Sequence, residues 1–331
     1  MPRSSAAPRK VVVGTSLLGL WGSYPGLPAR LAQLADLVDR MADDAARNFP
    51  GRRLDIAALP EFAVNGGLKG HCRQTAQELR GPVLDTMADV ARRHQCYLTV
   101  PLYLVEDRAA DRYANIVALL DRRGEMVGMY RFAHPSVREM ENGLTPGGEF
   151  PVFDCDFGRV GIQICGDVHY DDGWRALKRG GAELVLQIAQ PATPLEVALR
   201  ARTHRYYVLS ATWRDSAALF APTGHTLAEL RSGGSPVMTA EIDLSYALLG
   251  WQPALAGGQA FTDRYGDRAG FRYWSEDDCG LFWSNDPATP ITRMLRDLGY
   301  LPLDKELRRN QKAQKAAREK GEDFRIATGE L

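Results

Sequence analysis

Hydrophobic and polar residues follow one another along the chain in two patterns, one typical of buried strands and one of amphipathic helices. Residues 10–16, KVVVGTS, form a short apolar run that predicts a buried strand. Residues 27–49 carry apolar side chains at three- and four-residue steps, which predicts a helix with one buried face. By the same criteria we expect strands at 52–60, 96–105, 113–121, 125–132, 150–155, 159–165, 182–189, 207–213, 217–221 and 236–242, and helices at 82–94, 172–182 and 195–208.

The order of these elements predicts one α/β domain over residues 1–245, because strand pairs are interleaved with helices and no linker interrupts them. Residues 246–303 are rich in Gly, Pro, Trp and Tyr. We expect them to form an extension of extended segments that packs on the domain or on a partner subunit. Residues 304–331 are nearly all charged and polar, which is typical of a solvated helix or a disordered end.

Composition and charge exclude several classes of protein. The chain has 331 residues, of which 45% are hydrophobic and 25% charged, as in soluble globular proteins. Its 41 basic residues balance 41 acidic ones, which argues against general binding to nucleic acid or to an anionic membrane. No apolar run approaches the roughly 18 residues of a membrane span, and the N-terminus lacks a secretory cleavage pattern.

Cysteine and histidine usage favours a cytoplasmic protein with reduced thiols. The five cysteines show no CxxC spacing, which argues against a disulfide framework and a zinc ribbon. The six histidines are not paired at ligand spacing, so we expect no metal and no cofactor.

Two residues lie at the ends of predicted strands, where α/β folds commonly carry their catalytic side chains. Cys165 ends an apolar strand just before Gly166, and a thiol at a strand-to-helix turn is well placed as a nucleophile. Judged alone, a buried structural cysteine is the more common case. Glu61 follows Pro60 at the end of another strand, where a carboxylate could be a general base or a simple capping group.

Residues 138–167, REMENGLTPGGEFPVFDCDFGRVGIQICGD, carry the most specific pattern. They resemble the segment that leads into the nucleophilic cysteine of the nitrilase, or carbon–nitrogen hydrolase, superfamily. LPEF at 59–62 and YANIVALLDRRGEMVGMYR at 113–131 are similar to two further motifs of that family, in the same order. The resemblance spans roughly residues 9–243.

The resemblance implies a four-layer αββα sandwich that assembles into homodimers or larger homo-oligomers. It also implies a Glu-Lys-Cys triad that cleaves non-peptide C–N bonds through a thioester or thioimidate. Cys165 then corresponds to the nucleophile and Glu61 to the general base. We expect Glu141, just before the TPGG turn, to be the second glutamate of the family, with Glu139 as a close rival.

The chain departs from the family pattern at the lysine. Tyr130, Arg131 and His134 fit the Y-R-K-x-H motif, but position 132 is phenylalanine, and Gly166 replaces a residue that is usually bulky and aromatic. Losing one oxyanion donor costs about a hundred- to a thousand-fold in rate. An apolar ring should also raise the pKa values of a neighbouring carboxyl and thiol, which predicts a weak or altered catalyst.

Three interpretations of the missing lysine remain open. Another cation could replace it, with Arg131, His134 and His169 as candidates. The protein could instead be a pseudoenzyme that acts as a binding or assembly module. Finally, Lys69 or Lys178 could reach the site if the motif is misaligned.

We expect a hydrolase that acts on a small amide or carbamoyl compound, with a catalytically impaired binding protein as the alternative. Catalysis would depend on Cys165, Glu61 and Glu141. The residues expected to contact the substrate are Phe132, His134, Gly166, His169 and Trp213.

Overall fold

A computed structural model describes residues 7–320, apart from the side chains of residues 253 and 254. The chain forms two compact units. The first comprises Val11–Ile242, and the second comprises the described residues before position 11 together with those from Asp243 onward.

The first unit contains two six-stranded sheets. One has the strand order β12-β1-β2-β3-β4-β5 and the other the order β11-β10-β9-β8-β7-β6. The strands of the first sheet are β1 (Lys10–Ser16), β2 (Ile56–Ala58), β3 (Tyr97–Asp107), β4 (Arg112–Leu120), β5 (Met126–Arg131) and β12 (Val237–Asp243). Those of the second are β6 (Val152–Asp154), β7 (Arg159–Ile164), β8 (Leu184–Ile188), β9 (Tyr207–Ala211), β10 (Ser216–Phe220) and β11 (Thr226–Arg231). The runs β1-β2-β3 and β7-β8-β9 are parallel, so their carboxyl ends lie at a common edge of each sheet.

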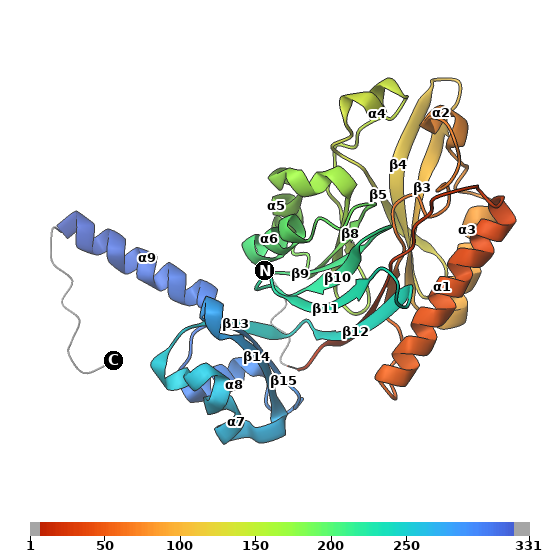
Figure 1. Ribbon diagram of the computed structural model, residues 1–331. Coiled ribbons are helices and arrows are strands. Elements are labelled where there is room, and N and C mark those ends of the chain that lie inside the picture. The colour runs from red at the N-terminus through yellow and green to blue at the C-terminus, as the bar shows by residue number, and fades with distance from the viewer. Residues whose placement is uncertain (1–6, 321–331) are drawn as a thin grey trace. The chain divides into compact units, whose positions relative to one another are not determined.

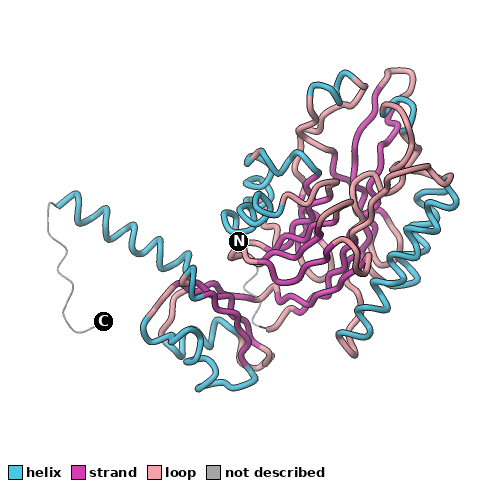
Figure 2. Tube along the Cα trace, in the orientation of Figure 1, coloured by secondary structure: helices cyan, strands magenta, loops and turns pink. Residues whose placement is uncertain are grey.

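Helices cover the outer faces of both sheets, and the predicted four-layer αββα sandwich is confirmed. The helices are α1 (Leu27–Asn48), α2 (Cys72–Thr75), α3 (Pro82–His94), α4 (Val137–Glu141), α5 (Asp171–Arg179) and α6 (Pro194–His204), with a 3-10 helix, η1, at Cys165–His169. α1 and α3 lie against the first sheet, and α5 and α6 against the second (Figure 1). Figure 2 shows the two layers of strands between these helices.

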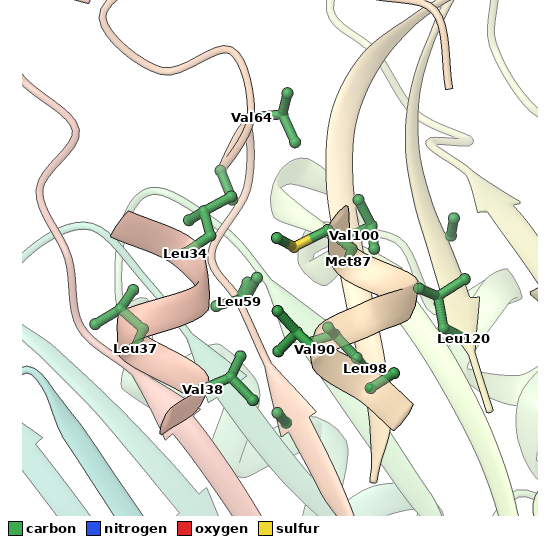
Figure 3. Close-up of a cluster of buried hydrophobic side chains, with 14 of the residues drawn as sticks. Leu34, Leu37, Val38, Leu59, Val64, Met87, Val90, Leu98, Val100 and Leu120 are labelled. Carbon is green, nitrogen blue, oxygen red and sulfur yellow. The ribbon is translucent and has the colours of Figure 1, made fainter. Parts of the chain in front are cut away.

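The larger hydrophobic core lies between α1, α3 and the first sheet. The apolar stripe of α1 recurs at three- and four-residue steps, as expected for a helix packed on a sheet. Figure 3 shows Leu34 and Val38 of α1 near Val90 of α3 and Leu98 of β3. This packing fixes β2 and β3, whose ends carry residues of the candidate site.

The short elements were the hardest to predict. The strand at 10–16 and the helix at 82–94 are confirmed to the residue, whereas β2 spans only Ile56–Ala58 of the predicted 52–60. α2, α4 and β11 were not predicted. A capping-box signal was present for α4, since Ser136 is followed three residues later by Glu139, and each caps the other in the structure.

The second unit corrects the expectation of extended segments after residue 245. It contains a three-stranded antiparallel sheet of order β13-β15-β14. Its elements are β13 (Tyr246–Gly250), β14 (Ala269–Trp274), β15 (Cys279–Ser284), α7 (Gln259–Tyr265), α8 (Ile291–Leu298) and α9 (Leu303–Lys320), with 3-10 helices at Pro253–Gly258, Gly266–Arg268 and Ser275–Asp277. Phe261, Phe282 and Met294 belong to a core of its own, so the aromatic residues pack on one another.

Within residues 7–320, no helix is both long and apolar enough to cross a membrane. The same residues contain no cluster of three or more His, Cys, Asp or Glu side chains suited to a metal ion.

We expect Leu34→Ala to lower the free energy of unfolding by about 2 to 5 kcal/mol, because it leaves a cavity in the core between α1 and the first sheet. Urea denaturation would measure the change. Leu195→Ala is the matched control, since Leu195 on α6 is 78% exposed and its truncation should cost under about 0.5 kcal/mol. Equal losses of unfolding free energy in the two variants would contradict the burial of Leu34 in this core.

Candidate active site

Cys165 occupies a strained turn at the end of β7. It is the first residue of η1, and its φ of 40° lies in the left-handed region that favours glycine. Such a conformation costs on the order of 1 to 3 kcal/mol and persists where surrounding contacts impose it, often at active sites. Gln187 contributes one of these contacts, because its Nε2 donates to the Cys165 carbonyl at 3.0 Å.

Glu61 lies beside the Cys165 thiol although the two residues are far apart in sequence. It follows Pro60 after β2, and its side chain is 1% exposed. Asn115 Nδ2 donates to Glu61 Oε1 at 2.8 Å, and Trp213 Nε1 donates to the Glu61 carbonyl at 2.6 Å. Within the described residues Oε2 is buried without a hydrogen-bond partner, which leaves one carboxylate oxygen available for a proton or a substrate.

The environment of the two groups favours their neutral forms. Burial raises the pKa of Glu61 to about 8, and the hydrogen bond from Asn115 opposes that shift. Burial raises the pKa of the Cys165 thiol, and the neighbouring Glu61 raises it further. Both directions agree with the expectation from the sequence, so a neutral thiol faces a largely protonated carboxyl at pH 7.

Phe132 and Gly166 fill adjacent space. Phe132 follows β5, is 2% exposed, and is held by hydrogen bonds from its N–H to the Asn115 carbonyl and from the Gly147 N–H to its own carbonyl. A Cβ added at Gly166 would lie 3.4 Å from Phe132 Cζ. Positions 132 and 166 are therefore neighbours in space, and a large side chain at 166 would compete with the ring at 132.

Asp167 connects the loop after β5 to the turn that carries Cys165. Its fully buried carboxylate accepts hydrogen bonds from Tyr130 Oη at 2.7 Å and from the Ile164 N–H at 2.9 Å. It also accepts from the His134 N–H at 3.2 Å and lies 2.7 Å from His134 Nδ1. The ring of His134 also stacks on that of Tyr170, with ring centroids 4.1 Å apart. Together with the contacts to Asp167, this stacking fixes the position of the His134 side chain.

The other residues considered as a replacement for the missing lysine lie away from Cys165. Arg131 forms an ion pair with Glu106, and His169 is exposed. Lys69 and Lys178 are both exposed, and Lys178 Nζ donates to the carbonyl of Arg205, the residue that follows α6. These positions argue against a cation from any of these four residues beside Cys165.

The second glutamate requires a correction. We expected Glu141, but its side chain is exposed, and its carbonyl accepts from Arg73. Glu139 is close enough to the site for its charge to raise the pKa of both Glu61 and Cys165. These charge effects favour Glu139, which the capping box with Ser136 holds at the start of α4.

Sequence reasoning missed two residues that contact the site. Asn115 lies within the quoted motif at 113–131, but the hydrogen bond of its side chain to Glu61 was not foreseen. Gln190 follows β8 and is close enough to the site for its backbone to lower the pKa of Cys165 and its side chain to lower that of Glu61. Its position just beyond the carboxyl end of a parallel strand was the available signal.

Trp213, expected to contact the substrate, helps to form an apolar wall beside Glu61. Its ring meets that of Trp21 edge-on at 4.9 Å and that of Phe62 at 6.4 Å. Together with its hydrogen bond to the Glu61 carbonyl, these contacts fix the segment that carries the candidate base.

Comparison with known proteins gives a consistent result. The family model described as "Carbon-nitrogen hydrolase" matches residues 22–248. The "Hydrolase in pqqF 5'region" of Pseudomonas protegens is 28% identical over 235 residues, which cover 67% of this chain and 77% of that protein. The "Nitrilase and fragile histidine triad fusion protein NitFhit" of Drosophila melanogaster is 27% identical over 270 residues, 73% of this chain and 56% of that protein.

Among solved structures, an amidase from Nesterenkonia sp. superposes with a TM-score of 0.61. It is 18% identical, and the superposition covers 73% of this chain and 92% of the amidase. At that identity the likeness shows the fold alone.

We expect Glu61→Gln to become more stable relative to the wild type as the pH rises from 5 to 9. The folded protein keeps a proton on Glu61 up to about pH 8, whereas the unfolded chain releases it near 4.5, so wild-type stability falls across this window. The difference in the free energy of unfolding between the variant and the wild type should change by roughly 3 to 5 kcal/mol across this window, as measured by urea denaturation at each pH. Parallel pH profiles would contradict a raised pKa.

We also expect Gly166→Leu to destabilise the protein and Phe132→Ala to relieve part of that cost in the double variant. A double-mutant cycle by urea denaturation should give a coupling of about 1 to 2 kcal/mol. Gly166→Ala is the control, because a single Cβ makes only ordinary contact with the ring. Additive costs would show that the two positions do not share space.

Proposed function

The chain belongs to the carbon–nitrogen hydrolase family, and from that premise we propose that it hydrolyses a small, non-peptide amide or carbamoyl compound. In this proposal Cys165 is the nucleophile, Glu61 is the general base, and Glu139 supports the site electrostatically. The Nesterenkonia protein, which shares the fold, is an amidase, and we extend an amide-type substrate to this chain.

One arrangement carries the proposal: Cys165 in a left-handed turn beside a buried glutamate. A strained nucleophile next to a base is the usual arrangement in covalent acyl transfer. The free Oε2 of Glu61 supports the role of a base, because it can take a proton without breaking a hydrogen bond within the described residues.

The proposed reaction has two halves. The Cys165 sulfur bonds to the carbonyl carbon while Glu61 takes the thiol proton, and the carbonyl π pair moves onto oxygen. Collapse of this intermediate breaks the C–N bond, and Glu61 returns the proton to the leaving nitrogen. Water then attacks the thioester carbon while Glu61 accepts its proton. Collapse breaks the C–S bond and releases the acid, and Glu61 returns the proton to the Cys165 sulfur.

Alkaline conditions should favour this chemistry. Glu61 acts as a base only when it is ionised, and its pKa of about 8 keeps it mostly protonated at pH 7. A cation beside the site would lower the pKa values of both acids, but Phe132 supplies none. The proposed enzyme is therefore slow at neutral pH and faster above pH 8.

A second candidate function is that of a binding or assembly protein that keeps the hydrolase fold. The buried ring of Phe132 favours it, because this ring stands where the family resemblance places a catalytic lysine. Under this alternative Cys165 would remain a neutral, unactivated thiol.

We expect release of ammonia or amine from short aliphatic amides and N-carbamoyl amines to rise between pH 6 and 10, with a midpoint near pH 8. Cys165→Ala should abolish the release. Phe132→Lys should raise the rate at pH 7 by about ten- to a thousand-fold, because it restores a cation for the oxyanion and the thiolate.

Cys155→Ala is the matched control, since Cys155 lies in the turn between β6 and β7. Alkylation of Cys165 by iodoacetamide, followed by peptide mass spectrometry, gives a measurement that needs no substrate. No Cys165-dependent release at any pH, together with slow alkylation that Phe132→Lys does not accelerate, would favour the binding protein.

A further inference from the structure

Tyr103 lies on the same face of the first sheet as a residue that holds Glu61. On β3 it pairs directly with Asn115 on β4. Directly opposed residues of antiparallel strands place their side chains side by side on one face. Since Asn115 Nδ2 donates to Glu61 at 2.8 Å, the Tyr103 side chain stands next to the group that positions the candidate base.

The ring and the backbone of Tyr103 are both fixed. Its ring centroid lies 4.2 Å from that of Phe62, the residue after Glu61, with a tilt of 35°. Its N–H donates to Asn65 Oδ1 at 2.7 Å, and its carbonyl accepts from the Gln77 N–H at 2.8 Å. Such contacts hold a side chain in one place without any contribution from its hydroxyl.

The hydroxyl itself is available to a ligand. The Tyr103 side chain is partly exposed, and within residues 7–320 its hydroxyl has no hydrogen-bond partner. Burial raises the pKa of Tyr103, and the charges of Glu61 and Glu139, followed by Cys72 and Cys165, raise it further. The phenol therefore lies among the acidic groups of the site and stays protonated as a hydrogen-bond donor.

From this placement we propose that Tyr103 is a further catalytic residue, whose hydroxyl donates a hydrogen bond to the substrate's carbonyl oxygen in place of the cation missing at position 132. The inference rests on the proposed hydrolysis. In the first half-reaction the carbonyl oxygen gains the π pair as the Cys165 sulfur bonds to carbon. The phenol then donates to that oxyanion without losing its proton.

A phenol replaces only one of the two roles of an ammonium group. It stabilises a developing oxyanion, because a fixed donor in a water-poor site interacts strongly with new negative charge. It adds no positive charge, so it does not lower the pKa of the thiol, in agreement with the raised pKa of Cys165. Attack on a carbonyl should therefore depend on Tyr103, whereas attack on a saturated carbon should not.

The test compares two reactions of Cys165 in the full-length protein at pH 9. Acetylation by p-nitrophenyl acetate passes through an oxyanion, whereas alkylation by iodoacetamide displaces iodide at a saturated carbon and forms none. Tyr103→Phe keeps the ring that packs on Phe62 and removes only the hydroxyl. We expect acetylation of Cys165 to slow by about ten- to a hundred-fold and alkylation to change less than about twofold, both followed by peptide mass spectrometry.

Tyr97→Phe, on the same strand β3, is the matched control and should leave both rates unchanged. If Tyr103→Phe is acetylated as fast as the wild type, or if both of its rates fall together, Tyr103 is not an oxyanion donor and the proposed hydrolysis still stands. If the wild type is alkylated but never acetylated, the proposed hydrolysis itself fails, and the role of Tyr103 fails with it.

Discussion

The buried carboxylate of Asp167 is the interaction on which the candidate site depends. It joins Tyr130 at the end of β5 and His134 beyond it to the Ile164 N–H that precedes Cys165. These groups belong to different sheets of the sandwich, so one side chain ties the edge strand of the first sheet to the turn that carries Cys165 in the second. Removing a buried acceptor would leave several donors unpaired, which is far more costly than the loss of one hydrogen bond.

The contacts of Asp167 hold in place a site that contains several acidic groups and few groups that would balance their negative charge. Glu61 is buried beside Cys165 with Glu139 nearby, and burial keeps the first two neutral near pH 7. The backbone is strained at both, since Phe62 after Glu61 and Cys165 itself have positive φ values. Rigid polar contacts from Asn115 and Gln187, instead of ion pairs, hold these groups in place.

The sequence was informative where one local rule decided the structure. The helix at 82–94 was predicted to the residue, because its periodicity and its proline at the first turn agree. Family motifs pointed to Cys165 and Glu61, which the structure brings together, but the choice between Glu139 and Glu141 depended on how a five-residue helix is capped. Strand register places Tyr103 beside Asn115, which a single sequence does not reveal. Aromatic residues after 245 suggested a covering extension, although they form a core of their own.

The shared space of Phe132 and Gly166 has a consequence for redesign of the protein. A bulky residue at 166 and the ring at 132 compete for one volume, so a large side chain at one position calls for a smaller one at the other. Removing the ring alone would leave unfilled space beside the glycine, which costs packing energy. A library that varies one of these positions at a time would therefore miss the well-packed combinations, whereas a library that varies both together would contain them.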